Sequence, residues 1–216
     1  LLVPGFDPAT IKYLFDAQKV QDDITAHDLA MAREVKYDSV GTWEWIVTRA
    51  SNPYLMEVNT RIQVENGVSA MISRIKGQDG VDLIAEQIRT GLGEPLGYTQ
   101  KDITFEGMGI EYRIIAEAPE NNFTPWVGRI EKFAWKDAPW LKMHTHVPTD
   151  APYDIPTEFD PNLALGIVWG KDIEEVKKRG VEFLQGVTLD GADSRGGDMK
   201  TNLAFLEKKT ADILKF

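Results

Sequence analysis

The 216-residue chain contains no cysteine. This absence excludes disulfide bonds, thiol nucleophiles and cysteine-ligated zinc as sources of stability or chemistry. A chain without disulfides fits a reducing compartment, so the expected location is the cytoplasm. The chain begins with Leu1 rather than Met, and the sequence leaves open whether it is a natural subunit or a fragment.

Basic residues and long apolar runs are also scarce. The chain has 24 Lys and Arg against 34 Asp and Glu, which gives a formal net charge of −10. This charge disfavours nucleic acid or an anionic membrane surface as the main partner. No apolar run approaches the roughly 20 residues that span a bilayer, and no signal-peptide pattern opens the chain. The remaining composition, 43% hydrophobic and 27% charged, is typical of a globular protein.

Hydrophobic periodicity predicts an α+β fold. Helices come first, and a mostly antiparallel set of strands with intervening helices follows, which is the order typical of this class. The predicted helices cover 11–20 (beginning at Asp7-Pro8), 25–35, 81–92, 171–184 and a part of 201–215. The predicted strands cover 41–49, 54–63, 107–117, 127–135, 141–147 and 163–169, and the predicted loops include 77–80 and 190–198. The first two strands, joined by the turn Ser51-Asn52-Pro53, are expected to form a hairpin.

Polar side chains alternate with apolar ones in the segment MEVNTRIQVEN, residues 56–66. Side chains at every second position of a strand share one face. The residues expected on that face, as far as the extended geometry persists, are Glu57, Asn59, Arg61, Gln63 and Glu65. Alternation of this kind also occurs in any half-exposed strand, and a surface ion-pair ladder is the ordinary alternative.

A third acid, Glu44, lies between two tryptophans on the first predicted hairpin strand. We expect it to lie on the same side of the hairpin as Glu57. Two carboxylates and the amide oxygen of Asn59 form the hard oxygen set that Mg²⁺ prefers. Arg61 suits a small anion, and Glu65 next to that anion can accept a proton from it. The segment therefore predicts a metal site, an anion site and a base in this order.

The run EVNTRIQVE resembles the motif E-M-N-T-R-I-Q-V-E of biotin carboxylases. These are the ATP-grasp subunits or domains of acetyl-CoA, propionyl-CoA and pyruvate carboxylases. Further stretches resemble the family in the same order: GTWEW, GVDLIAEQIR, GIEYRIIAEAP and FTPWVGRI. The resemblance runs from about residue 24 to about residue 207 and corresponds to the C-terminal half of the family. It implies a helical lead-in over 1–40, the C-terminal lobe of an ATP-grasp fold over 41–105, and a β-rich biotin carboxylase C-terminal domain over 106–216.

The resemblance also implies roles for individual residues. The implied ligands of Mg²⁺ or Mn²⁺ are Glu44, Glu57 and Asn59; the implied bicarbonate-site residues are Arg61, Gln63 and the backbone of Val64; the implied general base is Glu65, and the implied biotin-site arginine is Arg113. The implied reaction has two steps. Bicarbonate attacks the γ-phosphate of ATP to give carboxyphosphate, and the CO₂ that it releases is captured by N1 of biotin.

The chain departs from the family in several places. The glycine-rich phosphate-covering loop and the ATP-binding lysines have no equivalent in residues 1–40, and the pair Gly196-Gly197 is interpreted as a plain loop. The family's His-Pro after the base is Asn66-Gly67, which is expected to loosen this loop, and the lysine of Y-Y-D-S-x-I-G-K-L is Leu165. The resemblance implies as partners an ATP-binding half, a biotin carboxyl carrier protein and a carboxyltransferase, with a homodimeric contact.

Two alternatives stay open. A non-catalytic assembly or regulatory subunit would explain the departures, whereas the intact acids and arginines oppose it. Another ATP-grasp carboxylate–amine ligase is the third hypothesis, and the continuation R-I-Q-V-E favours the biotin branch. Outside this segment, His144 and His146 are too few for a metal site, and a structural role is favoured for His146. The tryptophans Trp126, Trp135 and Trp140 are expected in the core or at a subunit interface.

Overall fold

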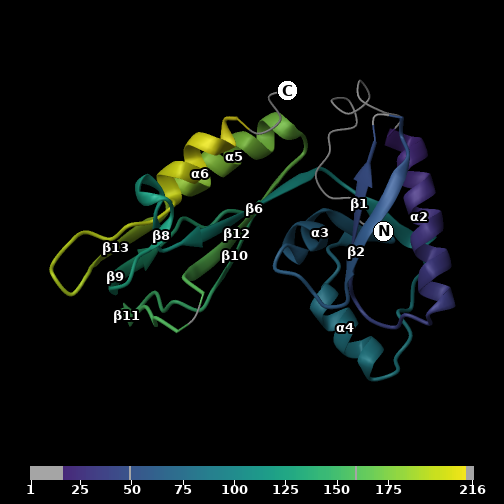
Figure 1. Cartoon of the computed structure of the whole chain (residues 1–216), viewed down its shortest axis with the longest axis horizontal. Helices are drawn as coiled ribbons and strands as arrows, with labels where there is room; N and C mark the ends of the chain where they lie inside the picture. The colour runs from purple at the N-terminus through teal and green to yellow at the C-terminus, as the bar shows by residue number, and fades with distance from the viewer. Residues whose placement is uncertain (1–16, 49, 159, 213–216) are drawn as a thin grey trace. The chain divides into compact units, whose positions relative to one another are not determined.

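The computed structural model describes residues 17–48, 50–158 and 160–212 and divides the chain into two compact units, Leu1–Met108 and Gly109–Phe216 (Figure 1). Both units mix helices with antiparallel strands, so the prediction of an α+β fold is confirmed. In the described part of the chain, no helix combines the length and apolar character needed to cross a membrane. Residues 7–16, which carry the start of the first predicted helix, lie outside the described residues.

The described residues of the first unit form one long helix, a two-stranded hairpin, and a small sheet with two short helices. Its elements are α2 (Ala17–Glu34), β1 (Thr42–Val47), β2 (Pro53–Asn59), α3 (Asn66–Ile72), β3 (Ser73–Ile75), β4 (Gln78–Asp79), α4 (Leu83–Gly91), a short 3₁₀ turn (Gln100–Asp102) and β5 (Ile103–Phe105). The predicted hairpin is present as the antiparallel pair β1–β2. The helix predicted over 25–35 is part of the longer, uninterrupted α2.

Two predictions about short segments were wrong. Residues 77–80 are not a plain loop, because β4 pairs with β3 and the order of this small sheet is β4-β3-β5. The strand predicted to reach residue 63 ends at Asn59, and the unpredicted helix α3 begins at Asn66. The side chain of Asn66 bonds back to the carbonyl of Gln63. The chain between Asn59 and Asn66 therefore turns instead of continuing as a strand.

Helix α4 shows how local chemistry sets its two ends. The Asp82 carboxylate accepts hydrogen bonds from two backbone N–H groups of the first turn, at 3.1 and 2.9 Å. Beyond the last turn, Gly93 adopts φ = +81°. Its N–H donates to the carbonyl of Thr90, and the N–H of Glu94 donates to that of Arg89, both at 2.9 Å. This is the Schellman arrangement, which explains why the glycine follows the helix end.

The described residues of the second unit form a central three-stranded sheet, a second three-stranded sheet, a short two-stranded pair and two α-helices. Its elements are β6 (Met108–Ile115), β7 (Glu117–Ala118), a 3₁₀ turn (Pro119–Asn121), β8 (Thr124–Pro125), β9 (Arg129–Ala134), β10 (Leu141–Thr145), β11 (Tyr153–Asp154), β12 (Asn162–Gly170), α5 (Ile173–Gly186), β13 (Thr188–Ala192) and α6 (Leu203–Thr210). The strand orders are β10-β12-β6, β11-β9-β13 and β7-β8. Every strand and helix predicted for this unit is present with shifted ends, although β13 ends at Ala192, inside the stretch that we predicted as a loop over 190–198.

The core of the second unit lies between the central sheet and α5. Val168 of β12, Ile114 of β6 and Val176 of α5 are completely buried. Gly166 of β12 leaves no room for a Cβ atom, because the ring of Phe183 from α5 occupies that space. The close approach of helix to strand at Gly166 fixes how α5 packs against the sheet.

An arginine between two tryptophans ties α5 to the same sheet. The guanidinium of Arg179 lies 5.6 Å from the ring centre of Trp140 and 5.4 Å from that of Trp169. It also donates to the backbone carbonyl of Trp169 at 2.9 Å and pairs with Glu175 at 3.1 Å. Trp140 therefore packs inside the unit, and Trp126 is also buried there.

Candidate functional site: a carboxylate pair on a hairpin

The β1–β2 hairpin places two acids directly opposite each other. Glu44 pairs with Glu57 across the ladder, and Thr42 pairs with Asn59. Residues opposite each other in an antiparallel pair lie on the same face. The amide Nδ2 of Asn59 donates to Oε1 of Glu44 at 2.9 Å and to Oε1 of Glu57 at 3.3 Å. The structure thus brings together the three residues that the sequence suggests as metal ligands.

The hairpin contains a β-bulge next to this cluster. The register changes between Glu44 and Trp45, because Trp45 lies opposite Leu55 while Glu44 lies opposite Glu57. Met56 is therefore an extra residue in β2. Because of this residue, Leu55 and Glu57 belong to opposite faces although they are two positions apart.

The aromatic face of the hairpin packs against the segment that precedes it. The indole N–H of Trp45 donates to Oδ1 of Asp28 in α2 at 3.1 Å. Trp43 contacts the ring of Tyr37 edge-on, with 6.1 Å between the ring centres. These contacts occupy the face opposite Glu44, so the two acids stay on the face that α2 leaves open.

The composition of the cluster suits one class of ion. The described residues contain no group of three His, Cys, Asp or Glu side chains that could hold a metal ion. Two carboxylates with one amide instead match the way Mg²⁺ binds, which uses one or two carboxylates and completes its shell with waters and substrate phosphates. A cation would also relieve the repulsion between the facing carboxylates Glu44 and Glu57. The donor set therefore fits Mg²⁺ or Mn²⁺.

The remaining polar residues of the segment do not continue this face. Because β2 ends at Asn59, the alternation no longer applies to Arg61, Gln63 and Glu65. Arg61 is exposed, and its guanidinium donates to the carbonyl of Ile62 at 3.2 Å. Glu65 is exposed and directly precedes helix α3. The predicted single row of five polar residues is thus wrong, and the last three lie on a turn.

Asn66 closes that turn. Its side-chain Nδ2 donates to the carbonyl of Gln63 at 2.7 Å and to that of Val64 at 3.4 Å. Its backbone N–H donates to the same Gln63 carbonyl at 3.3 Å. We expected Asn66-Gly67 to loosen the loop that carries Glu65, but the structure shows the Asn66 side chain bonded to that loop.

The predicted biotin-site residue, Arg113, belongs to the second unit. It lies on β6 between Tyr112 and Ile114, whose side chains are 3% and 0% exposed, while Arg113 itself is exposed. Its backbone carbonyl accepts a hydrogen bond from Nδ2 of Asn202 at 2.9 Å. Asn202 is not recognisable from the sequence as a partner of Arg113, because it lies at the start of the stretch 201–215 and resembles an ordinary helix cap.

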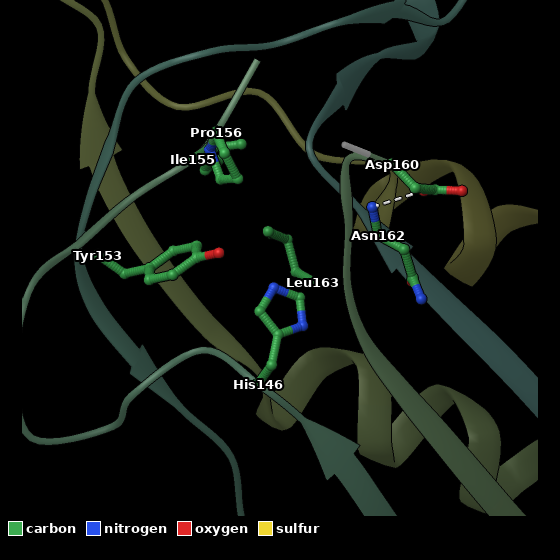
Figure 2. A pocket seen from close by; sticks show the side chains of 7 residues that line it. All are labelled: His146, Tyr153, Ile155, Pro156, Asp160, Asn162 and Leu163. Atoms are coloured by element: carbon green, nitrogen blue, oxygen red, sulfur yellow. Dashed lines mark hydrogen bonds between the residues drawn. The ribbon is translucent and has the colours of Figure 1, made fainter. Parts of the chain in front are cut away.

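A cavity of about 450 Å³ lies elsewhere in the second unit (Figure 2). Its lining residues are His146, Tyr153, Ile155, Pro156, Asp160, Asn162 and Leu163. The ring of His146 packs edge-on against that of Tyr153, with 5.6 Å between their centres. This contact agrees with a structural role for the histidine, and the cavity contains none of the predicted site residues.

Two family models match consecutive parts of the chain. The model described as "Carbamoyl-phosphate synthase L chain, ATP binding domain" matches residues 12–99. The model described as "Biotin carboxylase C-terminal domain" matches residues 111–212.

Named relatives extend this similarity. The chloroplastic biotin carboxylase of Arabidopsis thaliana is 39% identical over 163 residues, which are 76% of this chain and 29% of that protein. The biotin carboxylase of Nostoc sp. is 41% identical over 141 residues, 65% of this chain and 30% of that protein. The chain therefore spans less than a third of the length of these curated relatives.

Solved structures share the fold. The biotin carboxylase domain of a thermophilic 2-oxoglutarate carboxylase bound to bicarbonate superposes with a TM-score of 0.80 at 32% identity, covering 93% of this chain and 42% of that one. The corresponding domain dimer from Hydrogenobacter thermophilus, in complex with MgADP, ADP and bicarbonate, gives 0.74 at 35% identity, covering 84% and 37%. The predicted fold, an ATP-grasp lobe followed by a β-rich C-terminal domain, is confirmed.

Proposed function

Because this chain belongs to the biotin carboxylase family, we propose that it supplies the metal, bicarbonate and biotin-contacting residues of an ATP-dependent biotin carboxylase. The observation that carries this proposal is the hydrogen-bonded cluster of Glu44, Glu57 and Asn59 on one face of the hairpin. A surface ion-pair ladder would place opposite charges across the strands, whereas here two like charges face each other and share one amide donor. Such an arrangement is stabilised when a cation binds.

In this proposal, the cluster holds Mg²⁺ or Mn²⁺ against the phosphates of ATP. A metal ion held by these residues would neutralise charge on the phosphates, which is the main requirement of phosphoryl transfer. Asn59 orients both carboxylates through its two N–H···O contacts. Partners of this kind fix the direction of ligand oxygens before the ion arrives.

The turn after β2 would bind and activate bicarbonate. The guanidinium of Arg61 pairs with the anion, and the side chain of Gln63 and the backbone of Val64 flank it. Glu65 accepts the bicarbonate proton as the oxygen of the anion attacks the γ-phosphorus of ATP. The bond from that phosphorus to ADP breaks, and carboxyphosphate forms.

The second step takes place at biotin. Carboxyphosphate breaks down to CO₂ and phosphate, and the released phosphate takes the N1 proton of the ureido group. N1 then forms the new bond to the carbon of CO₂. Arg113 stabilises the negative charge on the ureido oxygen during this step. The product is carboxybiotin on a carrier protein, from which a carboxyltransferase takes the carboxyl group.

The proposed activity requires further protein. The curated relatives are about three times as long as the matched part of this chain, so ATP would be bound together with an ATP-binding half. The other proposed partners are a biotin carboxyl carrier protein and a carboxyltransferase, and a second copy of the chain forms a homodimer. We propose a cytoplasmic location, as expected for a chain without cysteine.

The test is bicarbonate-dependent ATP hydrolysis with free biotin, measured on the chain mixed with an ATP-binding half. We expect activity only in the mixture, and a loss of at least about 100-fold with Glu65→Gln, as for removal of a general base. The matched control is Glu94→Gln, which changes an exposed acid of the same unit and should leave the rate unchanged.

One result would favour a different function. If no mixture with a functional ATP-binding half shows activity, the chain is better described as a non-catalytic assembly or regulatory subunit. The observation on the side of that alternative is the replacement of the family's lysine by Leu165 and of its His-Pro by Asn66-Gly67.

A further inference from the structure

The side chain of Asn202 forms hydrogen bonds with the backbone of β6 at Arg113, the residue that we assign to biotin. Its Nδ2 donates to the carbonyl of Arg113 at 2.9 Å, and its Oδ1 accepts from the N–H of Ile115 at 3.0 Å. Its own backbone N–H donates to the carbonyl of Ile115 at 3.2 Å. Three hydrogen bonds thus join two segments that lie 87 to 89 positions apart in the chain.

The place of Asn202 makes this pairing unusual. The residue precedes α6, where an asparagine side chain normally accepts from backbone N–H groups of the first helical turn. Asn202 makes no such cap, and its side chain is directed to the strand instead. It is 4% exposed, and both ends of its amide are satisfied by β6. A buried amide held at both ends is rigid, because releasing it would leave polar atoms unpaired.

The sheet topology explains why the backbone of β6 can form hydrogen bonds with the Asn202 side chain. The strand lies at the edge of the sheet β10-β12-β6. The carbonyl of Arg113 and both polar groups of Ile115 point away from the neighbouring strand, since residues two apart in a strand direct these groups to the same side. Asn202 occupies the position that a further strand would take, and it satisfies an edge that would otherwise be open.

We propose that Asn202 is a positioning residue for Arg113: it fixes the backbone from which the exposed guanidinium reaches the ureido group of biotin. This inference rests on the proposed function of Arg113. Arg113 is exposed while the residues on both sides of it are buried, so the direction of its side chain depends on the backbone of β6. Catalytic groups must be held to within about 0.5 Å of their working position, and a misplacement of about 1 Å costs on the order of 100-fold in rate.

The chain contains a matched control at the other end of α6. The hydroxyl of Thr210 donates to the hydroxyl of Tyr112 at 3.1 Å, and Thr210 is 1% exposed. Thr210 therefore joins the same helix to the same strand through a buried polar contact. Its contact reaches only a side chain of β6, whereas Asn202 holds the backbone of Arg113. Thr210→Val breaks the contact between Thr210 and Tyr112 and leaves the hydrogen bonds of Asn202 to β6 intact.

The experiment compares variants of the complete enzyme that contains this chain. The variants are Asn202→Ala, Thr210→Val, Arg113→Ala and the double variant Asn202→Ala/Arg113→Ala. We measure Tm, the KM for biotin, the KM for bicarbonate and the biotin-independent ATP hydrolysis that reports the first step. Asn202→Ala is expected to raise the KM for biotin or lower the biotin-dependent rate by about tenfold or more. The KM for bicarbonate and the first step should stay within about twofold of wild type.

A second variant covers the case in which Asn202→Ala fails to fold. Asn202→Asp keeps the acceptor for the Ile115 N–H and removes the amide donor to the Arg113 carbonyl and to the Glu117 carboxyl. It is made together with Glu117→Gln, because the Glu117 carboxyl also bonds Asn202. The expected result is the same selective defect in the biotin step, with a smaller loss of Tm.

The outcomes separate this inference from the proposed function. If Thr210→Val impairs biotin use as much as the Asn202 variants at an equal loss of Tm, Asn202 is only structural and the inference is overturned. If Arg113→Ala is defective and the double variant is no worse, both proposals are supported. If Arg113→Ala itself leaves the biotin step unchanged, the assignment of Arg113 is wrong and the role of Asn202 is lost with it.

Discussion

Trp45 donates its indole N–H to the carboxylate of Asp28 across 3.1 Å, and this bond joins helix α2 to the hairpin that carries the acids. Asp28 is 5% exposed, and its second oxygen has no hydrogen-bond partner among the described residues. Burial raises the pKa of Asp28 above its ordinary value near 3.8, and the bond from Trp45 partly offsets this rise. Ionisation of Asp28 therefore destabilises the folded contact between α2 and the hairpin.

This contact makes the stability of the first unit depend on pH. A carboxyl whose pKa is raised by folding contributes stability below its unfolded pKa and loses it as the pH rises through the folded value. Asp28→Asn keeps the acceptor for Trp45 and cannot ionise. The Tm of this variant minus the Tm of wild type should therefore be larger at pH 7 than at pH 4. Trp45→Phe should cost about 1 kcal/mol, as expected for one lost hydrogen bond, and the cost should be larger at pH 7 than at pH 4, because this bond favours the ionised carboxylate.

The check is thermal unfolding of the chain at both pH values. A Tm difference between Asp28→Asn and wild type that stays constant with pH would contradict the assignment of a raised pKa to Asp28.

The second prediction concerns Asn59, whose amide contacts both Glu44 and Glu57. Asn59→Ala removes this donor and leaves the two carboxylates without a common partner. The affinity for Mn²⁺ should fall about 10- to 100-fold, which is typical for the loss of a group that orients metal ligands. Titration of the metal-dependent ATP hydrolysis of the complete enzyme measures this effect.

The control for Asn59 lies on the same hairpin. Asn52→Ala changes an exposed asparagine in the turn between β1 and β2, whose hydrogen bonds with Thr48 are made by the Asn52 backbone. Equal losses of metal affinity in the two variants would show that the hairpin as a whole, rather than the amide of Asn59, matters for the ion.

The third prediction uses two glycines at the end of α4. Gly91 is the last helical residue and Gly93 follows with φ = +81°, and a Cβ atom at either position would meet nothing within 4 Å. Gly91→Ala should stabilise by about 0.5–1 kcal/mol, because alanine favours the helix. Gly93→Ala should destabilise by about 1 kcal/mol, because a positive φ strains any residue with a Cβ.

Urea unfolding of the two variants gives these values directly. Effects of the same sign would mean that the Schellman arrangement does not set the end of α4.

The parts of the fold that depend on nearest neighbours were predictable from the sequence. The hairpin followed from β-branched and aromatic residues on both sides of a turn signal, and the helix predicted over 171–184 corresponds to α5 (Ile173–Gly186). The short elements α3 and β4 were missed, because seven and two residues are too few to show a period. The strand end at Asn59 was missed because the polar alternation continues into a turn that the side chain of Asn66 holds.

Long-range contacts explain the remaining gap at the candidate site. The spacing of Glu57 and Asn59, with Glu44 on the neighbouring strand, was enough to place the three together. Nothing local indicates that Asn202 belongs with Arg113, since the asparagine before α6 has the sequence signature of a cap. The partner is revealed by the three long-range hydrogen bonds that join Asn202 to β6.

The extra residue at Met56 affects how the hairpin can be compared with related sequences. On the turn side of Met56, the two strands keep the register of the pair Val47 and Pro53. On the other side, they keep the register of the pair Glu44 and Glu57. The two halves of the hairpin thus count their faces separately. If a related sequence lacks the extra residue, its gap belongs at Met56. Placing that gap in the turn would shift residues 53–55 by one position and exchange their inward and outward faces, while the acids would still be matched. The part of the hairpin near the turn and the part that carries the acids should therefore be aligned as two independent blocks.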